Sequence, residues 1–295
     1  MISPRPPART ARTGGVAVTL CAVAALLGCS SPAQDELPTA SAAPAAAPVD
    51  YVALGDSYAS GYGAGSYVGE CGRSPLGTPT LLGAEEGITL AADATCAGAR
   101  AASEPGGPAA PPGQGADAVD AGRLSPDTGL VTVSAGGNDV GFGEVAGVCA
   151  AEAPPVCREV IATQNASALP VLESDLDTLY GTIRSAAPDA TVVVTGYPHL
   201  FSPEFGQTLL PPESQEAFNA GTDDLNEVLR ERADAHGFVF ADLVEPFRGH
   251  GLGAPEPWIT FQEGAPDNLH PTVEGYGSGY LPAILGSVDL DGSRR

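Results

Sequence analysis

Short apolar runs and longer segments of helical periodicity alternate along the chain from residue 49 onward. Runs rich in β-branched, aromatic and aliphatic residues predict strands at residues 49–54, 88–95, 130–134, 191–195 and 238–243. Helices are predicted at residues 78–86, 116–124, 169–186 and 213–235. Strands that alternate with helices in this way predict an α/β fold with a mostly parallel sheet covered on both faces.

Proline and glycine interrupt this pattern at three places. Residues 104–115 are rich in both and predict an irregular loop. Pro170 fits the first turn of its helix. Pro271 suits the start of a last helix at 272–285, but the three glycines within that segment give it a poor helix propensity.

The first 28 residues have the features of an export signal. Arg5, Arg9 and Arg12 precede residues 14–27, an apolar run without charge that is too short for a comfortable membrane span. A signal of this kind predicts that the rest of the chain works outside the cytoplasm.

The end of this signal resembles the lipobox of bacterial lipoproteins, because the small residue Gly28 stands directly before Cys29. The resemblance implies cleavage before Cys29 and a lipid anchor on that cysteine, at the outer face of the cell membrane. An ordinary secretory signal with free release is the alternative. Residues 29–48 are rich in Ala, Pro and Ser and predict a tether, residues 49–287 a single domain, and residues 288–295 a polar tail.

The chain is strongly acidic, with a net charge of −23 and no lysine. Nucleic-acid binding requires a basic patch, and so does electrostatic docking to anionic lipid, so the charge argues against both. We therefore expect membrane association only through lipid on Cys29, and a monomer that takes a small-molecule or lipid ester as its partner.

Four cysteines remain after Cys21 is removed with the signal and Cys29 is assigned to lipid. An even number in an exported chain predicts two disulfides, with three possible pairings. We favour Cys71–Cys96 and Cys149–Cys157, because each closes a local loop, and expect residues 150–157 to form such a loop. No Cys-x-x-Cys is present and histidines are few, so a metal site is not expected.

Candidate chemistry begins where the first predicted strand ends, at residues 55–61 (GDSYASG). Ligands of open α/β sheets bind outside the carboxyl ends of the strands, and a serine there becomes a nucleophile if a base reaches it. Ser57 is the candidate nucleophile, and Asp56 is expected to shape the turn. An ordinary strand-to-loop turn would use the same residue types.

His270 is the candidate base, chosen from the four histidines at 199, 236, 250 and 270. Asp267 precedes it by three residues. This spacing lets one short turn place both side chains together, with the carboxylate on one ring nitrogen and Ser57 on the other.

Four stretches in this order resemble the SGNH (GDSL-type) hydrolases, and most closely their secreted actinobacterial lipases and esterases. They are residues 55–61, Gly98 within 95–99, residues 136–139 (GGND) and residues 267–270 (DNLH). The resemblance implies a three-layer α/β/α, flavodoxin-like fold and a serine esterase or lipase without metal or organic cofactor. It also implies that some relatives orient the histidine with a backbone carbonyl in place of Asp267.

The family pattern further implies an oxyanion hole made by the N–H groups of Ser57 and Gly98 and the side-chain amide of Asn138. Gly98 could instead relieve crowding beside Cys96, and Asn138 could be a turn or helix cap. Unlike close relatives, which often carry a third disulfide, this chain has no cysteine after Cys157. Residues 199–213 and 248–266 are therefore expected to be looser and to face the substrate.

Three alternatives stay open at this point. Within hydrolases, the chain could be a polysaccharide deacetylase or a phospholipase. From a different class, it could be a non-catalytic binding lipoprotein displayed at the cell surface.

Overall fold

The computed structural model describes residues 47–102, 118–119 and 121–288. A five-stranded sheet in the order β2-β1-β3-β4-β5 forms the middle of the domain, and every neighbouring pair is parallel. Its strands are β1 (Val49–Gly55), β2 (Ile88–Asp93), β3 (Leu130–Ser134), β4 (Thr191–Thr195) and β5 (Val239–Ala241). The prediction of five strands in a parallel sheet is confirmed, with the second and fifth strands shorter than expected.

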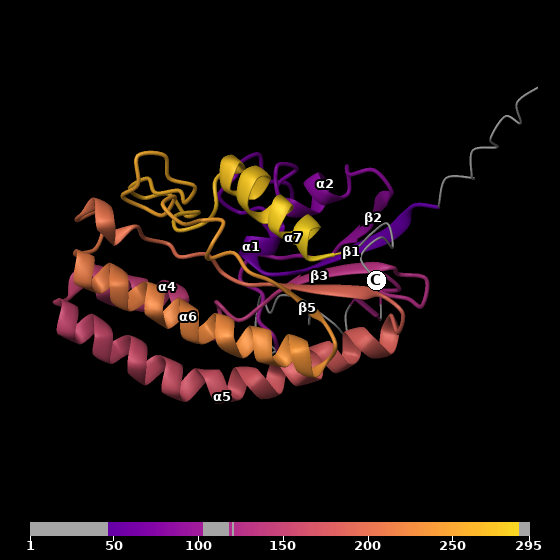
Figure 1. Ribbon diagram of the computed structural model, residues 1–295, viewed down its shortest axis with the longest axis horizontal. Helices are drawn as coiled ribbons and strands as arrows, with labels where there is room; N and C mark the ends of the chain where they lie inside the picture. Colours follow the sequence, from indigo (N-terminus) through magenta and orange to yellow (C-terminus); the bar gives the residue numbers. More distant parts are fainter. Residues whose placement is uncertain (1–46, 103–117, 120, 289–295) are drawn as a thin grey trace, which may run out of the picture. The chain divides into compact units, whose positions relative to one another are not determined.

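Helices cover both faces of the sheet (Figure 1). One face carries α4 (Phe142–Ala151), α5 (Pro154–Ala186) and α6 (Pro212–Ala235). The other carries α1 (Ser57–Ser60), α2 (Thr78–Leu82), the π-helical turn η2 (Gly275–Tyr280) and α7 (Leu281–Ser287). The expected three-layer α/β/α architecture is therefore present. Among the residues that the structure describes, no helix combines the length and the apolar character needed to cross a membrane.

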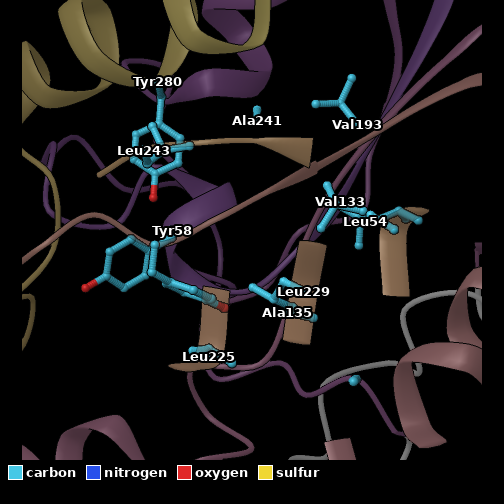
Figure 2. Close-up of a cluster of buried hydrophobic side chains, with 14 of the residues drawn as sticks. Leu54, Tyr58, Val133, Ala135, Val193, Leu225, Leu229, Ala241, Leu243 and Tyr280 are labelled. Atoms are coloured by element: carbon cyan, nitrogen blue, oxygen red, sulfur yellow. The ribbon is translucent and has the colours of Figure 1, made fainter. Parts of the chain in front are cut away.

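The core lies on both faces of the central strands. Figure 2 shows Leu229 of α6 beside Ala135, the residue directly after β3, while Tyr280 comes from the helical segment on the opposite side. All five residues of β3 are buried, as expected for a strand with helices on both faces. This rigid middle fixes the positions of the loops that leave the carboxyl ends of β1 and β3.

Helix α5 begins fifteen residues earlier than predicted. Pro154, which the sequence analysis assigned to a disulfide-closed loop, is its first residue, and Pro170 lies inside the helix. Only two residues of the added turns, Cys157 and Ile161, are buried, so these turns lack a continuous apolar period and were missed for that reason. They pack on α6, because a Cβ on Gly221 would lie 2.6 Å from Ile161. Asn165 also donates a hydrogen bond of 3.3 Å to the Gly221 carbonyl.

The last segment forms a helix despite its glycines. A Cβ on Gly275 would lie 2.7 Å from the Trp258 carbonyl oxygen, and a Cβ on Gly279 would lie 2.3 Å from the Phe247 ring. Glycine is therefore required for close packing, which outweighs its low helix propensity.

Several expectations concern residues with little or no description. The loop at 104–115 and the regions at 1–28 and 29–46, including Cys29, lie outside the described residues. The predicted helix at 116–124 is described only in part, and residues 121–124 form turns and bends, not a helix. The helix predicted at 78–86 ends earlier, at Leu82.

Candidate active site

The strand-to-helix turn after β1 presents Ser57 at the edge of the sheet. Gly55 has φ of 131°, and a Cβ there would lie 2.5 Å from the Ser134 carbonyl oxygen, so the turn requires glycine. Asp56 is the N-cap of α1, and its carboxylate accepts a hydrogen bond of 2.9 Å from the Tyr58 N–H. Ser57 is the first helical residue, where a backbone N–H has no intrahelical partner.

Asp56 is buried and serves the turn, as expected. The hydroxyl groups of Tyr197 and Ser134 donate hydrogen bonds of 2.5 and 3.3 Å to its two carboxylate oxygens. Burial raises the pKa of Asp56 to about 6, and the hydrogen bonds oppose that rise.

His270 meets Ser57 across 213 positions of sequence. Its Nε2 lies 2.8 Å from the Ser57 Oγ, and Ser57 is only 7 % exposed. Burial lowers the pKa of His270 below its usual value and so favours the neutral imidazole, which is able to accept a proton. The two candidates chosen from the sequence therefore have the geometry of a nucleophile and its base.

The second ring nitrogen of His270 does not bind the Asp267 carboxylate that the sequence spacing favoured. Its Nδ1 lies 2.9 Å from the carbonyl oxygen of Asn268, so a backbone carbonyl accepts this hydrogen bond. The carboxylate of Asp267 accepts a hydrogen bond from the Tyr67 hydroxyl instead. The arrangement is thus the one in which a backbone carbonyl, and not the Asp267 carboxylate, holds the ring.

The turn that carries His270 is fixed by the preceding loop. The Leu269 N–H donates to the Thr260 carbonyl (2.9 Å), and the Thr260 N–H donates to the His270 carbonyl (2.8 Å). Leu269 has φ of 64°, a left-handed conformation that costs a non-glycine residue free energy and that the surrounding contacts maintain. No periodic pattern in the sequence pointed to this support.

Aromatic side chains surround the imidazole, and sequence reasoning assigned none of them a role. The Tyr58 ring lies 4.9 Å from the His270 ring, and its hydroxyl donates a hydrogen bond of 2.5 Å to the Leu269 carbonyl. The Tyr62 ring meets His270 edge to face at 5.1 Å. Tyr276 donates a hydrogen bond of 2.8 Å to the Tyr62 carbonyl.

Gly98 and Asn138 both line the cavity that contains Ser57 and His270. Gly98 has φ of 84°, and its N–H has no hydrogen-bond partner within the part of the chain that the structure describes. The Asn138 amide donates one hydrogen bond of 2.9 Å to the Ala99 carbonyl, which orients the group and leaves its second hydrogen available.

The structure contains both disulfides expected from the sequence. One joins Cys71 to Cys96, which stands two residues before Gly98, and the other joins Cys149 of α4 to Cys157 of α5. These are the two pairings that the sequence analysis favoured, so that prediction is confirmed.

The cavity has a volume of about 220 Å³ and a largely apolar wall. Phe142, at the start of α4, stacks on Phe218 of α6 with 5.1 Å between the ring centres, and Leu200 completes this side. Among the described lining residues, Leu200 alone comes from the segments 199–213 and 248–266 that were expected to face the substrate.

The other three histidines have local partners. His199 pairs with Asp223 at 2.8 Å, His236 pairs with Asp177 at 2.9 Å, and His250 stacks on Trp258 at 3.8 Å. Within the described ranges, no group of three or more His, Cys, Asp or Glu side chains is arranged to hold a metal ion.

A parallel α/β sheet with a serine–histidine contact beyond its carboxyl edge is an arrangement that fits a hydrolase. The profile of the GDSL-like Lipase/Acylhydrolase family matches residues 53–277, so the chain belongs to that family and is an ester hydrolase.

Relatives of this chain include lipases of Streptomyces. "Lipase 1" of Streptomyces coelicolor is 38 % identical over 278 residues, which cover 92 % of this chain and 96 % of the relative. The crystal structure of an extracellular lipase from Streptomyces rimosus superposes with a TM-score of 0.71 at 36 % identity, covering 81 % of this chain and all of that chain. Phospholipase A1 from Streptomyces albidoflavus gives a TM-score of 0.72 at 33 % identity, covering 82 % of this chain and all of that chain.

Proposed function

We propose that this ester hydrolase works outside the cytoplasm and cleaves carboxylic esters through an acyl-enzyme on Ser57, with His270 as general acid and base. The observation that carries this proposal is the 2.8 Å contact between Ser57 Oγ and His270 Nε2 inside the cavity. The neutral imidazole accepts the serine proton as Oγ attacks the ester carbonyl, and returns that proton to the leaving alcohol. His270 then takes a proton from a water molecule, which attacks the acyl-enzyme, and returns it to the Ser57 Oγ as the acid leaves.

The oxyanion of the tetrahedral intermediate would be held by the N–H groups of Ser57 and Gly98 and by the Asn138 amide. Two of these donors are supported by the lack of another described partner for the Gly98 N–H and by the Ala99 contact that orients Asn138. Loss of one donor of this kind costs roughly 10²–10³ in turnover. The carbonyl of Asn268 would stabilise the imidazolium through Nδ1, in place of a third side chain.

The apolar wall of Phe142, Leu200 and Phe218 favours an acyl chain over a charged or sugar substituent. Phospholipid esters are a second candidate substrate class, because one relative of similar fold and 33 % identity is named a phospholipase A1.

Export and anchoring belong to this proposal as well. Two disulfides fit an oxidising compartment, and the residues before Cys29 have the features of a lipoprotein signal. Metabolic labelling with a palmitate analogue in an actinobacterial host should mark the wild-type chain. The Cys29→Ala variant should lose the label; retention of label by this variant would contradict anchoring at Cys29.

The test of the activity is a panel of p-nitrophenyl esters, from acetate to palmitate, together with phosphatidylcholine. We expect hydrolysis of at least one ester with an acyl chain, and loss of that activity in Ser57→Ala. Exclusive hydrolysis of acetyl esters would favour a deacetylase, and preference for phosphatidylcholine would favour the phospholipase. Full activity in Ser57→Ala would exclude the proposed mechanism.

A further inference from the structure

Tyr67 makes a side-chain contact with Asp267, the carboxylate that precedes His270 by three residues. Its hydroxyl donates a hydrogen bond to the Asp267 carboxylate and accepts one of 2.9 Å from the Gly63 N–H. The Tyr67 side chain comes from the loop after α1, whereas Asp267 belongs to the turn that carries His270. The hydrogen bond therefore joins two segments that are 200 positions apart.

The loop that carries Tyr67 lies directly against the histidine. A Cβ on Gly63 would lie 2.4 Å from the Pro271 carbonyl oxygen and 2.8 Å from the His270 Cβ. The Tyr67 ring packs on Tyr62 at 4.8 Å, and Tyr62 in turn meets the His270 ring at 5.1 Å. A movement of this loop would therefore change the position of the imidazole.

We propose that Tyr67 is a positioning residue that keeps the Asp267 carboxylate in a hydrogen bond away from His270, so that a backbone carbonyl oxygen, and not this carboxylate, holds Nδ1. The inference rests on the proposed function, in which His270 is the base for Ser57. A hydroxyl that donates to a carboxylate satisfies one of its oxygens and reduces the electrostatic effect of its charge nearby. Tyr67 thereby limits how strongly Asp267 stabilises the protonated imidazole.

Other ionisable groups also face His270, and substitutions of Tyr67 and Asp267 leave them unchanged. They are Asp56 and Tyr58 at the start of α1, Tyr62 in the following loop, and Tyr276 in η2. None of them bonds to Asp267 among the described contacts. A change that depends on both Tyr67 and Asp267 is therefore specific to this pair.

The experiment is an NMR titration of the His270 ring, with its resonance identified by its loss in His270→Gln. Tyr67→Phe keeps the ring and removes the hydroxyl, so the released carboxylate should raise the titration midpoint by up to about 1 pH unit. Asp267→Asn should lower the midpoint, because it removes a nearby negative charge. Adding Tyr67→Phe to Asp267→Asn should cause no further shift.

Tyr62→Phe is the matched control, because it removes a hydroxyl from the neighbouring ring but leaves the pair intact, and it should leave the midpoint in place. In the active enzyme, the acidic limb of the kcat/KM profile should move in the same direction as the midpoint. An unchanged midpoint in Tyr67→Phe, or an equal shift in the Asp267→Asn background, would overturn the proposal. The titration does not depend on turnover. It therefore tests the positioning role of Tyr67 even if the activity of Ser57→Ala shows the proposed function to be wrong.

Discussion

Tyr197 donates a hydrogen bond of 2.5 Å to the buried carboxylate of Asp56, from a position 141 residues further along the chain. The same tyrosine hydroxyl accepts a hydrogen bond of 3.0 Å from the Gly137 N–H. The contact therefore connects the end of β4 with the two glycine-containing turns after β1 and β3. The position of Ser57 depends on this connection, because Asp56 is its immediate neighbour.

Asp56 should make folding less favourable as pH rises from 4 to 6. Burial raises its pKa to about 6 in the folded protein, against about 4 in the unfolded chain, so the folded state binds the proton more tightly in this window. The free energy of unfolding of the wild type, relative to Asp56→Asn, should fall by about 2 kcal/mol across it. Urea unfolding at several pH values measures this difference. Asp189→Asn, which replaces an exposed carboxylate and leaves Asp56 in place, is the control and should keep the pH dependence of the wild type. A difference in unfolding free energy between the wild type and Asp56→Asn that does not change with pH would refute the prediction.

Gly63→Ala should damage both stability and turnover. The new methyl group would meet the Pro271 carbonyl and the His270 Cβ, and the backbone φ of 99° is unfavourable for alanine. Gly65→Ala is the matched control, since φ is 74° but a Cβ would meet nothing within 4 Å. We expect Gly65→Ala to cost about 1–2 kcal/mol and keep kcat, whereas Gly63→Ala should cost more and lower kcat at least about tenfold. Equal kcat values in the two variants would count against contact with His270.

The two disulfides should differ in their effect on catalysis. Removing Cys71–Cys96, which spans 25 residues, should cost about 3.5 kcal/mol, and removing Cys149–Cys157, which spans 8, about 2.5 kcal/mol. The first pair lies beside the cavity-lining Gly98, and the Cys71 carbonyl accepts a hydrogen bond from the Ala97 N–H at 2.9 Å. Paired alanine variants should therefore lower kcat only at the first disulfide. Denaturation and ester hydrolysis measured in parallel decide this, and equal kcat losses would contradict it.

Phe142→Ala should extend the acyl preference toward longer chains. The ring forms part of the apolar wall of a cavity of about 220 Å³, and its removal would leave room beside Phe218. The ratio of kcat/KM for the octanoate ester to that for the butyrate ester should rise by about tenfold. Phe205→Ala removes an exposed ring outside the described cavity lining and should leave the ratio unchanged. A ratio that is unaffected by Phe142→Ala would place the acyl chain elsewhere.

The sequence predicted the elements whose side chains are buried in a regular period. The strands are short apolar runs, and Ser57 follows the first of them directly, so the sheet edge and its serine could be located without coordinates. The first half of α5 was missed because only Cys157 and Ile161 in it are buried, too few to give a helical apolar period. Its packing on α6 at Gly221, through Ile161 and Asn165, is visible only in the structure.

The environment of His270 was harder to predict than its identity. Sequence spacing favoured Asp267 as the partner of the imidazole, but the tertiary contact with Tyr67 engages this carboxylate. Tyr67 lies in an irregular segment and is 38 % exposed, so neither periodicity nor hydrophobicity distinguished it. Contacts between two irregular loops cannot be deduced from the local pattern of either loop.

The central claim, that Ser57 is a nucleophile activated by His270, is tested most directly by labelling with a serine-directed fluorophosphonate followed by mass spectrometry. The account predicts one modified peptide, which carries the label on Ser57, and loss of labelling in both Ser57→Ala and His270→Gln. Labelling of a different serine, or undiminished labelling in His270→Gln, would contradict it.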